Sequence, residues 1–126
     1  MSAAIASKSD LARSLFDAYQ RKDRTLAERL LAGDFTFTSP YDDAIDRAEY
    51  FVRCWPTSEF FKAFEFEKIA EQGDDAFVNY KANTKDGEEF RNVEVLILKG
   101  GQIRAVNVYF GATYKDGKFV KQAETP

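Results

Sequence analysis

The sequence predicts an α+β domain in which three N-terminal helices pack on one face of a curved, mainly antiparallel sheet. Apolar side chains recur at helical spacing through most of the chain up to Trp55, and from Phe64 onward they alternate with polar ones. Short turns containing glycine separate these alternating segments, and turns that short join antiparallel neighbours.

Each expected helix has a recognisable start. Ser9 is predicted to cap a first helix, whose buried side carries Leu11, Leu15, Ala18 and Tyr19. Asp23 caps a shorter second helix, and Gly33 follows it where a left-handed C-terminal cap is favourable. A third helix is expected from Asp46 to just before Pro56.

The strands are predicted from the alternation of apolar and polar side chains. One strand lies between the helices, at 34–39, and four follow them, at 64–72, 76–84, 88–98 and 103–110. The last four are joined by turns at Gly73-Asp74, Asp86-Gly87 and Gly100-Gly101. The second half of the chain is therefore expected to form a four-strand meander.

Length and charge limit the organisation and the partners. A chain of 126 residues is expected to form a single domain over 1–126, with its core at about 9–111 and a polar tail at 115–126. Its 18 basic and 21 acidic residues give a net charge of -3 without a run of one sign that could follow phosphates or lipid headgroups. Neither nucleic acid nor a membrane is an expected partner.

The chain has one cysteine and no histidine. An internal disulfide is excluded, and Met1 to Ser9 lack the apolar stretch of a secretion signal, so a cytoplasmic protein is expected. The absence of histidine excludes triads with a histidine base, and no metal site is expected. Acid–base chemistry falls to Asp, Glu, Tyr, Lys or water, and no cofactor is expected.

Two-residue turns between the strands predict which side chains share a face. They place Lys68 near Asn79, and Asn79 and Asn107 on either side of Glu94. Because buried polar groups need partners, their clustering under the helices predicts a pocket. The other face would expose a large apolar patch, which predicts a homodimer through Val78, Tyr80, Val93, Val95, Ile97, Val106, Val108 and Phe110.

The order of elements, together with Leu-Lys-Gly-Gly-Gln-Ile at the last hairpin and Val-Asn-Val-Tyr-Phe after it, resembles the SnoaL-like branch of the nuclear transport factor 2 superfamily. The resemblance covers about residues 9–111. It implies a cone-shaped α+β barrel with a deep pocket, commonly dimeric, a fold used by polyketide cyclases, ketosteroid isomerases, epoxide hydrolases and non-catalytic proteins.

The resemblance also bears on single residues. Ser39, Leu15 and Gly111 stand where relatives carry a catalytic aspartate, an oxyanion tyrosine and a strand-end acid. Glu94 aligns with the strand acid that donates a hydrogen bond to the developing oxyanion in the isomerases.

The candidate catalytic residues are Glu94, Tyr109 and Asn107, and the candidate ligand-binding residues are Tyr19, Phe37, Trp55, Phe66, Asn79, Lys81 and Asn92. Glu94 is interpreted either as a proton shuttle with a pKa raised by burial or as a salt-bridge partner of Lys81 or Lys68. The tyrosines could donate hydrogen bonds to a ligand or simply pack, and Trp55 could form a pocket wall or fill the core.

Three further side chains have competing interpretations. Asp42 and Asp43 follow the first strand, where one could act as a base at the pocket rim, or both could form a turn. Cys54 has neither a histidine nor a second cysteine and is expected to be buried and inert. Two functions fit the whole pattern: proton transfer on a mainly apolar small molecule, or non-catalytic binding of a ligand or protein by a dimer.

Overall fold

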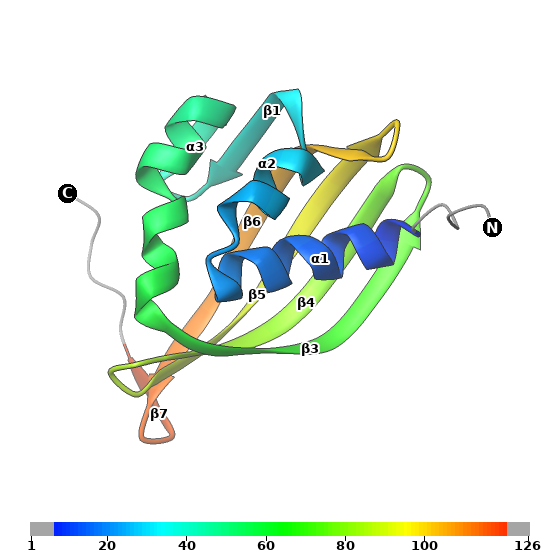
Figure 1. Cartoon of the computed structure of the whole chain (residues 1–126). Helices are drawn as coiled ribbons and strands as arrows, with labels where there is room; N and C mark the ends of the chain where they lie inside the picture. The colour runs from blue at the N-terminus through cyan, green and yellow to red at the C-terminus, as the bar shows by residue number, and fades with distance from the viewer. Residues whose placement is uncertain (1–6, 121–126) are drawn as a thin grey trace.

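The computed structural model describes residues 7–120, in which three α-helices and a short 3₁₀ helix accompany one sheet (Figure 1). The helical elements are α1 (Lys8–Arg21), α2 (Arg24–Leu30), α3 (Arg47–Arg53) and the 3₁₀ helix η1 (Trp55–Phe60). The strands are β1 (Leu31–Ser39), β2 (Asp42–Asp46), β3 (Phe61–Gln72), β4 (Asp75–Thr84), β5 (Glu88–Lys99), β6 (Gln102–Lys115) and β7 (Lys118–Val120). The predicted α+β class is confirmed.

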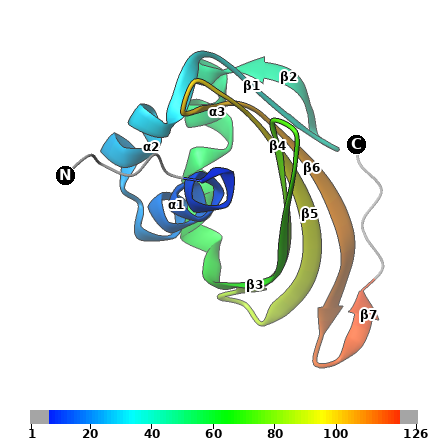
Figure 2. The ribbon, with the colours of Figure 1, turned by 90° about the vertical axis from the view of Figure 1, so that its right-hand side faces the viewer.

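The sheet curves around α1 on its concave side and does not close into a barrel (Figure 2). Its strand order is β2-β1-β6-β5-β4-β3, with β7 paired to β6. β3 to β6 form the expected antiparallel meander, and β1 joins it in parallel beside β6. The family resemblance implies a cone-shaped barrel, and the structure has the corresponding curved sheet without closure of the barrel.

Helix starts follow capping chemistry, with one correction. Asp23 and Asp46 cap α2 and α3 as predicted, each side chain accepting a backbone N–H bond. α1 is capped by Ser7 instead of Ser9, because Ser7 and Asp10 have the spacing of a capping box. The Ser9 hydroxyl instead donates to Glu71 on β3.

Three segments differ from the expected elements. The chain enters β1 directly after α2, so Gly33 lies within the strand and no left-handed cap is formed there. The expected loop at Asp42 and Asp43 is strand β2, paired antiparallel with β1. Residues 118–120 of the expected polar tail form β7, and residues 121–126 lie outside the described part.

The pairing of β4 with β5 differs by one residue from the predicted register. The turn at Asp86-Gly87 is a three-residue loop, 85–87, closed by a hydrogen bond from Gly87 N–H to the carbonyl of Thr84. Asn79 therefore pairs with Val93, and Glu94 pairs with Val78. A shift of one residue moves every side chain of a strand to the other face.

Irregular pairings in the neighbouring strands also alter which side chains lie on the inner face of the sheet. The register shifts between Phe66 and Lys68 in β3 and between Ile97 and Leu98 in β5. The predicted dimer surface is wrong for four members, because Val78, Tyr80, Val106 and Val108 are buried under the helices. Phe110 shares that inner face and lines the cavity described below.

Aromatic side chains join α1 to the sheet. The Phe16 ring packs edge-on against Phe64, Phe66 and Tyr80, with centroid separations of 5.7, 5.2 and 4.9 Å. Such pairs add about 0.5–1.5 kcal/mol each beyond the area they bury. No helix in the described residues is long and apolar enough to cross a membrane.

Gly111 permits a close approach between β5 and β6. A Cβ atom at this position would lie 2.1 Å from the carbonyl oxygen of Arg91. We expect Gly111→Ala to lower the free energy of unfolding by about 1–3 kcal/mol or more, because the backbones must move apart. Gly33→Ala is the matched control, since no heavy atom lies within 4 Å of the added Cβ. Urea unfolding of both variants tests this, and equal stabilities would contradict it.

Candidate functional site

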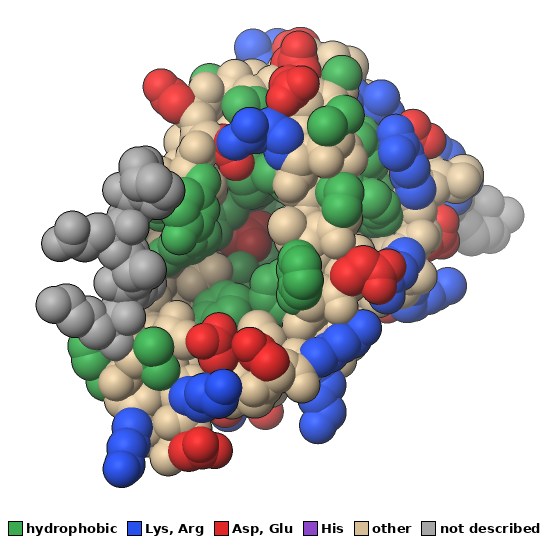
Figure 3. Space-filling model, turned by 90° about the vertical axis from the view of Figure 1, so that its left-hand side faces the viewer, with side chains coloured by type: hydrophobic (Ala, Val, Ile, Leu, Met, Phe, Trp, Pro, Cys, Tyr) green, Lys and Arg blue, Asp and Glu red, His purple; other side chains and the backbone are tan. Residues whose placement is uncertain are grey.

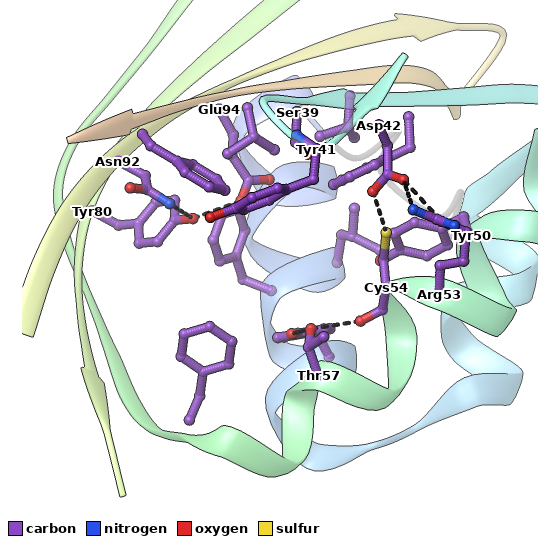
Figure 4. Close-up of a pocket in the computed structure, with 18 of the residues that line it drawn as sticks. Ser39, Tyr41, Asp42, Tyr50, Arg53, Cys54, Thr57, Tyr80, Asn92 and Glu94 are labelled. Carbon is purple, nitrogen blue, oxygen red and sulfur yellow. Dashed lines mark hydrogen bonds and ion pairs between the residues drawn. The ribbon is translucent and has the colours of Figure 1, made fainter. Parts of the chain in front are cut away.

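A cavity of about 580 Å³ lies between the helices and the concave face of the sheet. Its opening is a hollow whose walls are largely hydrophobic (Figure 3). The lining is dominated by aromatic rings: Phe16, Tyr19, Phe37, Tyr41, Tyr50, Phe61, Phe64, Tyr80 and Phe110. Polar groups reach it around Glu94, around Asp42 and at Thr57 (Figure 4).

Glu94 projects from the middle of β5 into this cavity. Its cross-strand neighbours on the inner face are Val78 and Val108, so apolar side chains flank the carboxyl group. The one hydrogen bond to Glu94 from a described residue is 2.8 Å long and comes from the Tyr80 hydroxyl to Oε2. Oε1 therefore has no hydrogen-bond partner in the described chain.

The direction of the hydrogen bonds around Glu94 follows from the atoms involved. The backbone N–H of Gly111 can only donate, so the Asn92 side-chain atom 3.2 Å from it is the oxygen. The Asn92 amide nitrogen then donates to the Tyr80 oxygen at 3.0 Å, and Tyr80 gives its own hydrogen to Glu94. When Glu94 is protonated, its proton is therefore on Oε1.

Burial dominates the proton affinities in this region. Burial raises the pKa of Glu94 from 4.5 to about 7, against the lowering effect of the Tyr80 hydrogen bond. Burial and then the charge of Glu94 raise the pKa of Tyr80 and of Tyr50 far above the usual tyrosine value. Glu94 is thus the cavity group whose charge changes near neutral pH.

A second polar group lies at the end of α3. Nε of Arg53 donates to Oδ1 of Asp42 at 2.8 Å, and a terminal guanidinium nitrogen forms an ion pair with the same oxygen at 2.6 Å. The Cys54 thiol lies 3.7 Å from Oδ2 of the same carboxylate. The Asp42 side chain is 9% exposed and that of Arg53 is 52% exposed, so Asp42 is enclosed while Arg53 reaches solvent.

The hydroxyl of Tyr19 is already engaged at the inner wall. It is hydrogen-bonded to Thr57, and Thr57 uses its own hydrogen on the carbonyl of Cys54, 2.6 Å away. Tyr19 must therefore donate to Thr57. Tyr50 also lines the cavity, and its hydroxyl has no hydrogen-bond partner in residues 7–120.

The structure brings together four of the predicted site residues. Tyr19, Phe37, Asn92 and Glu94 all line the cavity, but their functional roles stay predictions. Trp55 and Phe66 lie one layer behind its surface. Trp55 packs against Tyr19 with a centroid separation of 5.7 Å, and Phe66 packs against Phe16.

Four other predicted site residues lie on the opposite face of the sheet, so their placement under the helices is wrong. They are Asn79, Lys81, Asn107 and Tyr109. Lys81 forms ion pairs with Glu65 and Glu89, at 3.4 and 3.7 Å. The alternative interpretation of Glu94 as a salt-bridge partner of Lys81 or Lys68 is therefore wrong as well.

Several cavity residues are not among the site residues predicted from the sequence. Tyr80 is predicted on the outer face, because a pattern of alternating residues does not reveal the third residue of the 85–87 loop, which turns it inward. Tyr50 and Cys54 stand one helical turn apart, and that spacing indicates a shared face of α3. Arg53 gives no such signal, because its contact with Asp42 depends on the path of β2.

The SnoaL-like domain model matches residues 12–106, which is most of the chain. The chain belongs to the SnoaL-like family. No curated protein matches it.

Similar solved structures agree on the fold of this SnoaL-like domain. An NTF2-like protein of unknown function from Cytophaga hutchinsonii is 24% identical, with a TM-score of 0.72, over 87% of this chain and 94% of that one. A proposed polyketide cyclase from Sinorhizobium meliloti is 19% identical, with a TM-score of 0.65, over 79% and 93% of the two chains. An LEH-like epoxide hydrolase from M. tuberculosis is 14% identical, with a TM-score of 0.67, over 79% of each chain.

The arrangement is suited to exchanging one proton in an apolar enclosure. Glu94 directs one unpartnered carboxyl oxygen into the cavity, and Tyr50 adds a hydroxyl. No group of three or more potential metal-binding Cys, Asp or Glu side chains occurs in the described residues.

The raised pKa of Glu94 makes stability depend on pH. Between about pH 4.5 and 7 the folded state holds a proton that the unfolded chain has lost, so stability falls as pH rises through this window. The total loss is about 3 kcal/mol at 1.36 kcal/mol per pKa unit. We expect Glu94→Gln to abolish this loss. The free energy of unfolding of the variant should therefore gain on that of the wild type as the pH rises from 4 to 8.

Urea unfolding at pH 4, 6 and 8 measures the effect. Glu49→Gln, an exposed substitution of the same kind in α3, should keep the pH dependence of the wild type. A Glu94→Gln variant destabilised only at pH 8 would show that the ionised carboxylate stabilises the fold.

Proposed function

We propose that this SnoaL-like domain binds a mainly apolar small molecule in its cavity and that Glu94 exchanges a proton with it. The observation that carries the proposal is the unpartnered Oε1 of Glu94, which faces an aromatic cavity and has a pKa near neutrality. Since a buried carboxyl group without a partner for one oxygen is costly, a ligand atom at this position would lower that cost.

The walls favour a ligand with a flat, apolar body. A cavity of about 580 Å³ is within the usual size range of small-molecule sites. Aromatic rings line most of it, and the Tyr19 and Tyr80 hydroxyl hydrogens are already used within the protein. A ligand rich in hydroxyl groups would therefore leave many of its own polar atoms unsatisfied.

Glu94 is suited to acid–base chemistry in both of its states. When protonated, it can donate its Oε1 hydrogen to a ligand oxygen. When ionised, the same oxygen can take a proton from a carbon next to a carbonyl group. The electron pair of the broken C–H bond then forms the carbon–carbon double bond of the enolate, and the carbonyl oxygen takes the negative charge. A general acid or base works best when its pKa is close to the working pH. Isomerisation, cyclisation and hydrolysis all use proton transfer to or from the substrate. The last two reactions match the names of the two similar enzymes.

Exchange of carbon-bound protons tests this proposal. We expect the wild-type protein to accelerate deuterium uptake at the carbons next to the carbonyl of 2-tetralone in D₂O, followed by proton NMR against the spontaneous rate. The acceleration should rise with pH through about 7, as Glu94 becomes ionised. Glu94→Gln should reduce exchange to the spontaneous rate, whereas Glu49→Gln should retain it.

Binding is measured separately through Trp55, the only tryptophan, whose ring contacts Tyr19 behind the cavity wall. A change in its emission that saturates with 2-tetralone would report occupancy. A ligand at a hundred times its dissociation constant should also add about 2.7 kcal/mol of stability. Binding without accelerated exchange would favour the non-catalytic alternative, and no binding of any ring ketone would contradict the proposal as a whole.

We further propose that the domain forms a homodimer through the outer face of the sheet, over a patch smaller than the sequence predicts. Val93 and Tyr109 are cross-strand neighbours there and are 36% and 61% exposed. Val95 and Ile97 continue the patch along β5 and are partly exposed. Apolar patches of this kind often mark protein interfaces.

A charge in the middle of this patch should separate the protomers. We expect a dimer by sedimentation at micromolar concentration and a monomer for Val95→Glu, because an unpaired charge in an interface is strongly unfavourable. Val52→Glu, the same substitution at a 69% exposed position of α3, serves as a control for charge alone. A wild-type protein that remains monomeric would rule out the dimer.

A further inference from the structure

Asp42 sits on the far side of the cavity from Glu94 and is held in place from two directions (Figure 4). β2 carries its backbone, and Arg53 at the end of α3 fixes its side chain. The side chain lines the cavity although it is 9% exposed. This carboxylate is therefore enclosed, oriented and directed at the space a ligand would fill.

The two oxygens of Asp42 are satisfied unequally. Oδ1 receives the Nε hydrogen bond of Arg53 at 2.8 Å and also has the ion-pair contact at 2.6 Å. The one contact that a described residue makes with Oδ2 is the Cys54 thiol at 3.7 Å, and a thiol is a weak donor. Burial and then the charge of Asp42 raise the pKa of Cys54 to about 12, so the thiol keeps its hydrogen and does not compete as an acceptor. Oδ2 is an acceptor without a strong donor.

The cavity thus has two polar ends of opposite character. At the Glu94 end, the protonated carboxyl group offers a hydrogen on Oε1, because Oε2 is occupied by Tyr80. At the Asp42 end, Oδ2 offers a lone pair. Aromatic side chains form most of the wall between the two ends, including Phe37 and Phe110.

We propose that Asp42 is a second ligand contact, which selects a flat cyclic compound carrying a hydrogen-bond acceptor at one end and a hydroxyl group at the other. The carbonyl or ether oxygen of such a hydroxylated ring compound faces Glu94, and its hydroxyl donates to Oδ2 of Asp42. Arg53 holds the carboxylate in its orientation, and the outer part of that guanidinium remains in solvent. This assignment rests on the proposed small-molecule function and adds the substrate class and its orientation.

Pairs of compounds that differ only in the hydroxyl hydrogen test the assignment. The probes are 4′-hydroxyacetophenone, 6-hydroxy-1-tetralone and estrone, each with its methyl ether, because the three lengths cover different spans of the cavity. We expect the phenol to bind at least about tenfold more tightly than its ether in at least one pair, the effect of a hydrogen bond to a charged acceptor. Dissociation constants come from Trp55 emission and calorimetry.

Two variants distinguish ligand recognition by Asp42 from a purely structural role at the cavity rim. Asp42→Asn replaces the acceptor with an amide that can present a donor, so the phenol-to-ether preference should fall to about one. Arg53→Gln removes the guanidinium but leaves the Asp42 acceptor, so the preference should persist even if all affinities fall. If Asp42 only braces the rim, both variants weaken every compound alike and leave the preference unchanged, and that result would overturn the assignment.

The outcomes also distinguish this assignment from the proposed function. Equal binding of phenol and ether in every pair, with exchange that still depends on Glu94, would overturn the role of Asp42 alone. Failure of all six compounds to bind would overturn both. Glu94→Gln should leave the phenol preference intact, because that substitution acts at the opposite end of the cavity.

Discussion

A directed chain of hydrogen bonds ending on Glu94 is the interaction on which the site depends. It begins at a backbone N–H of Gly111, which can only donate, and each later bond inherits its direction from the one before. These hydrogen bonds therefore determine that Oε1 of Glu94 faces the cavity, although no described residue forms a hydrogen bond with Oε1. It forms because β6 approaches β5 closely at Gly111, where a side chain would collide with Arg91.

The irregular strand pairings have both a structural and a chemical consequence. They bend the sheet around α1, and the shift between β5 and β6 also turns Val108 inward beside Glu94. The three-residue loop 85–87 does the same for Tyr80. In a regular meander with two-residue turns, Asn79 and Asn107 would flank Glu94 instead. Amide groups on both sides would solvate the carboxylate and reduce the effect of burial on its pKa. The apolar neighbours are the reason that the proton affinity of Glu94 is high.

Sequence patterns predict the elements of this fold well and its strand faces poorly. Caps at Asp23 and Asp46 and the order of the meander follow from local chemistry, which a single sequence contains. The face of each strand depends on whether a turn has two or three residues, and one residue at Asp86-Gly87 reverses β4 relative to β5. Glu94 was predictable because it lies between Val93 and Val95, in the part of β5 that is otherwise apolar. Its partner Tyr80 was not, because its place on the face of Glu94 depends on the third residue of the 85–87 loop.

The polar groups of the cavity are selective because most of them are already satisfied. Thr57 donates to a backbone carbonyl, so Tyr19 must donate to Thr57 and has no hydrogen left for a ligand. Tyr80 is committed to Glu94 in the same way. The groups that remain for a ligand include one oxygen of Glu94, the hydroxyl of Tyr50 and the weakly contacted oxygen of Asp42. A cavity with many hydroxyl groups is thereby reduced to a few directional contacts, and a ligand that satisfies them must lie in one orientation between aromatic walls.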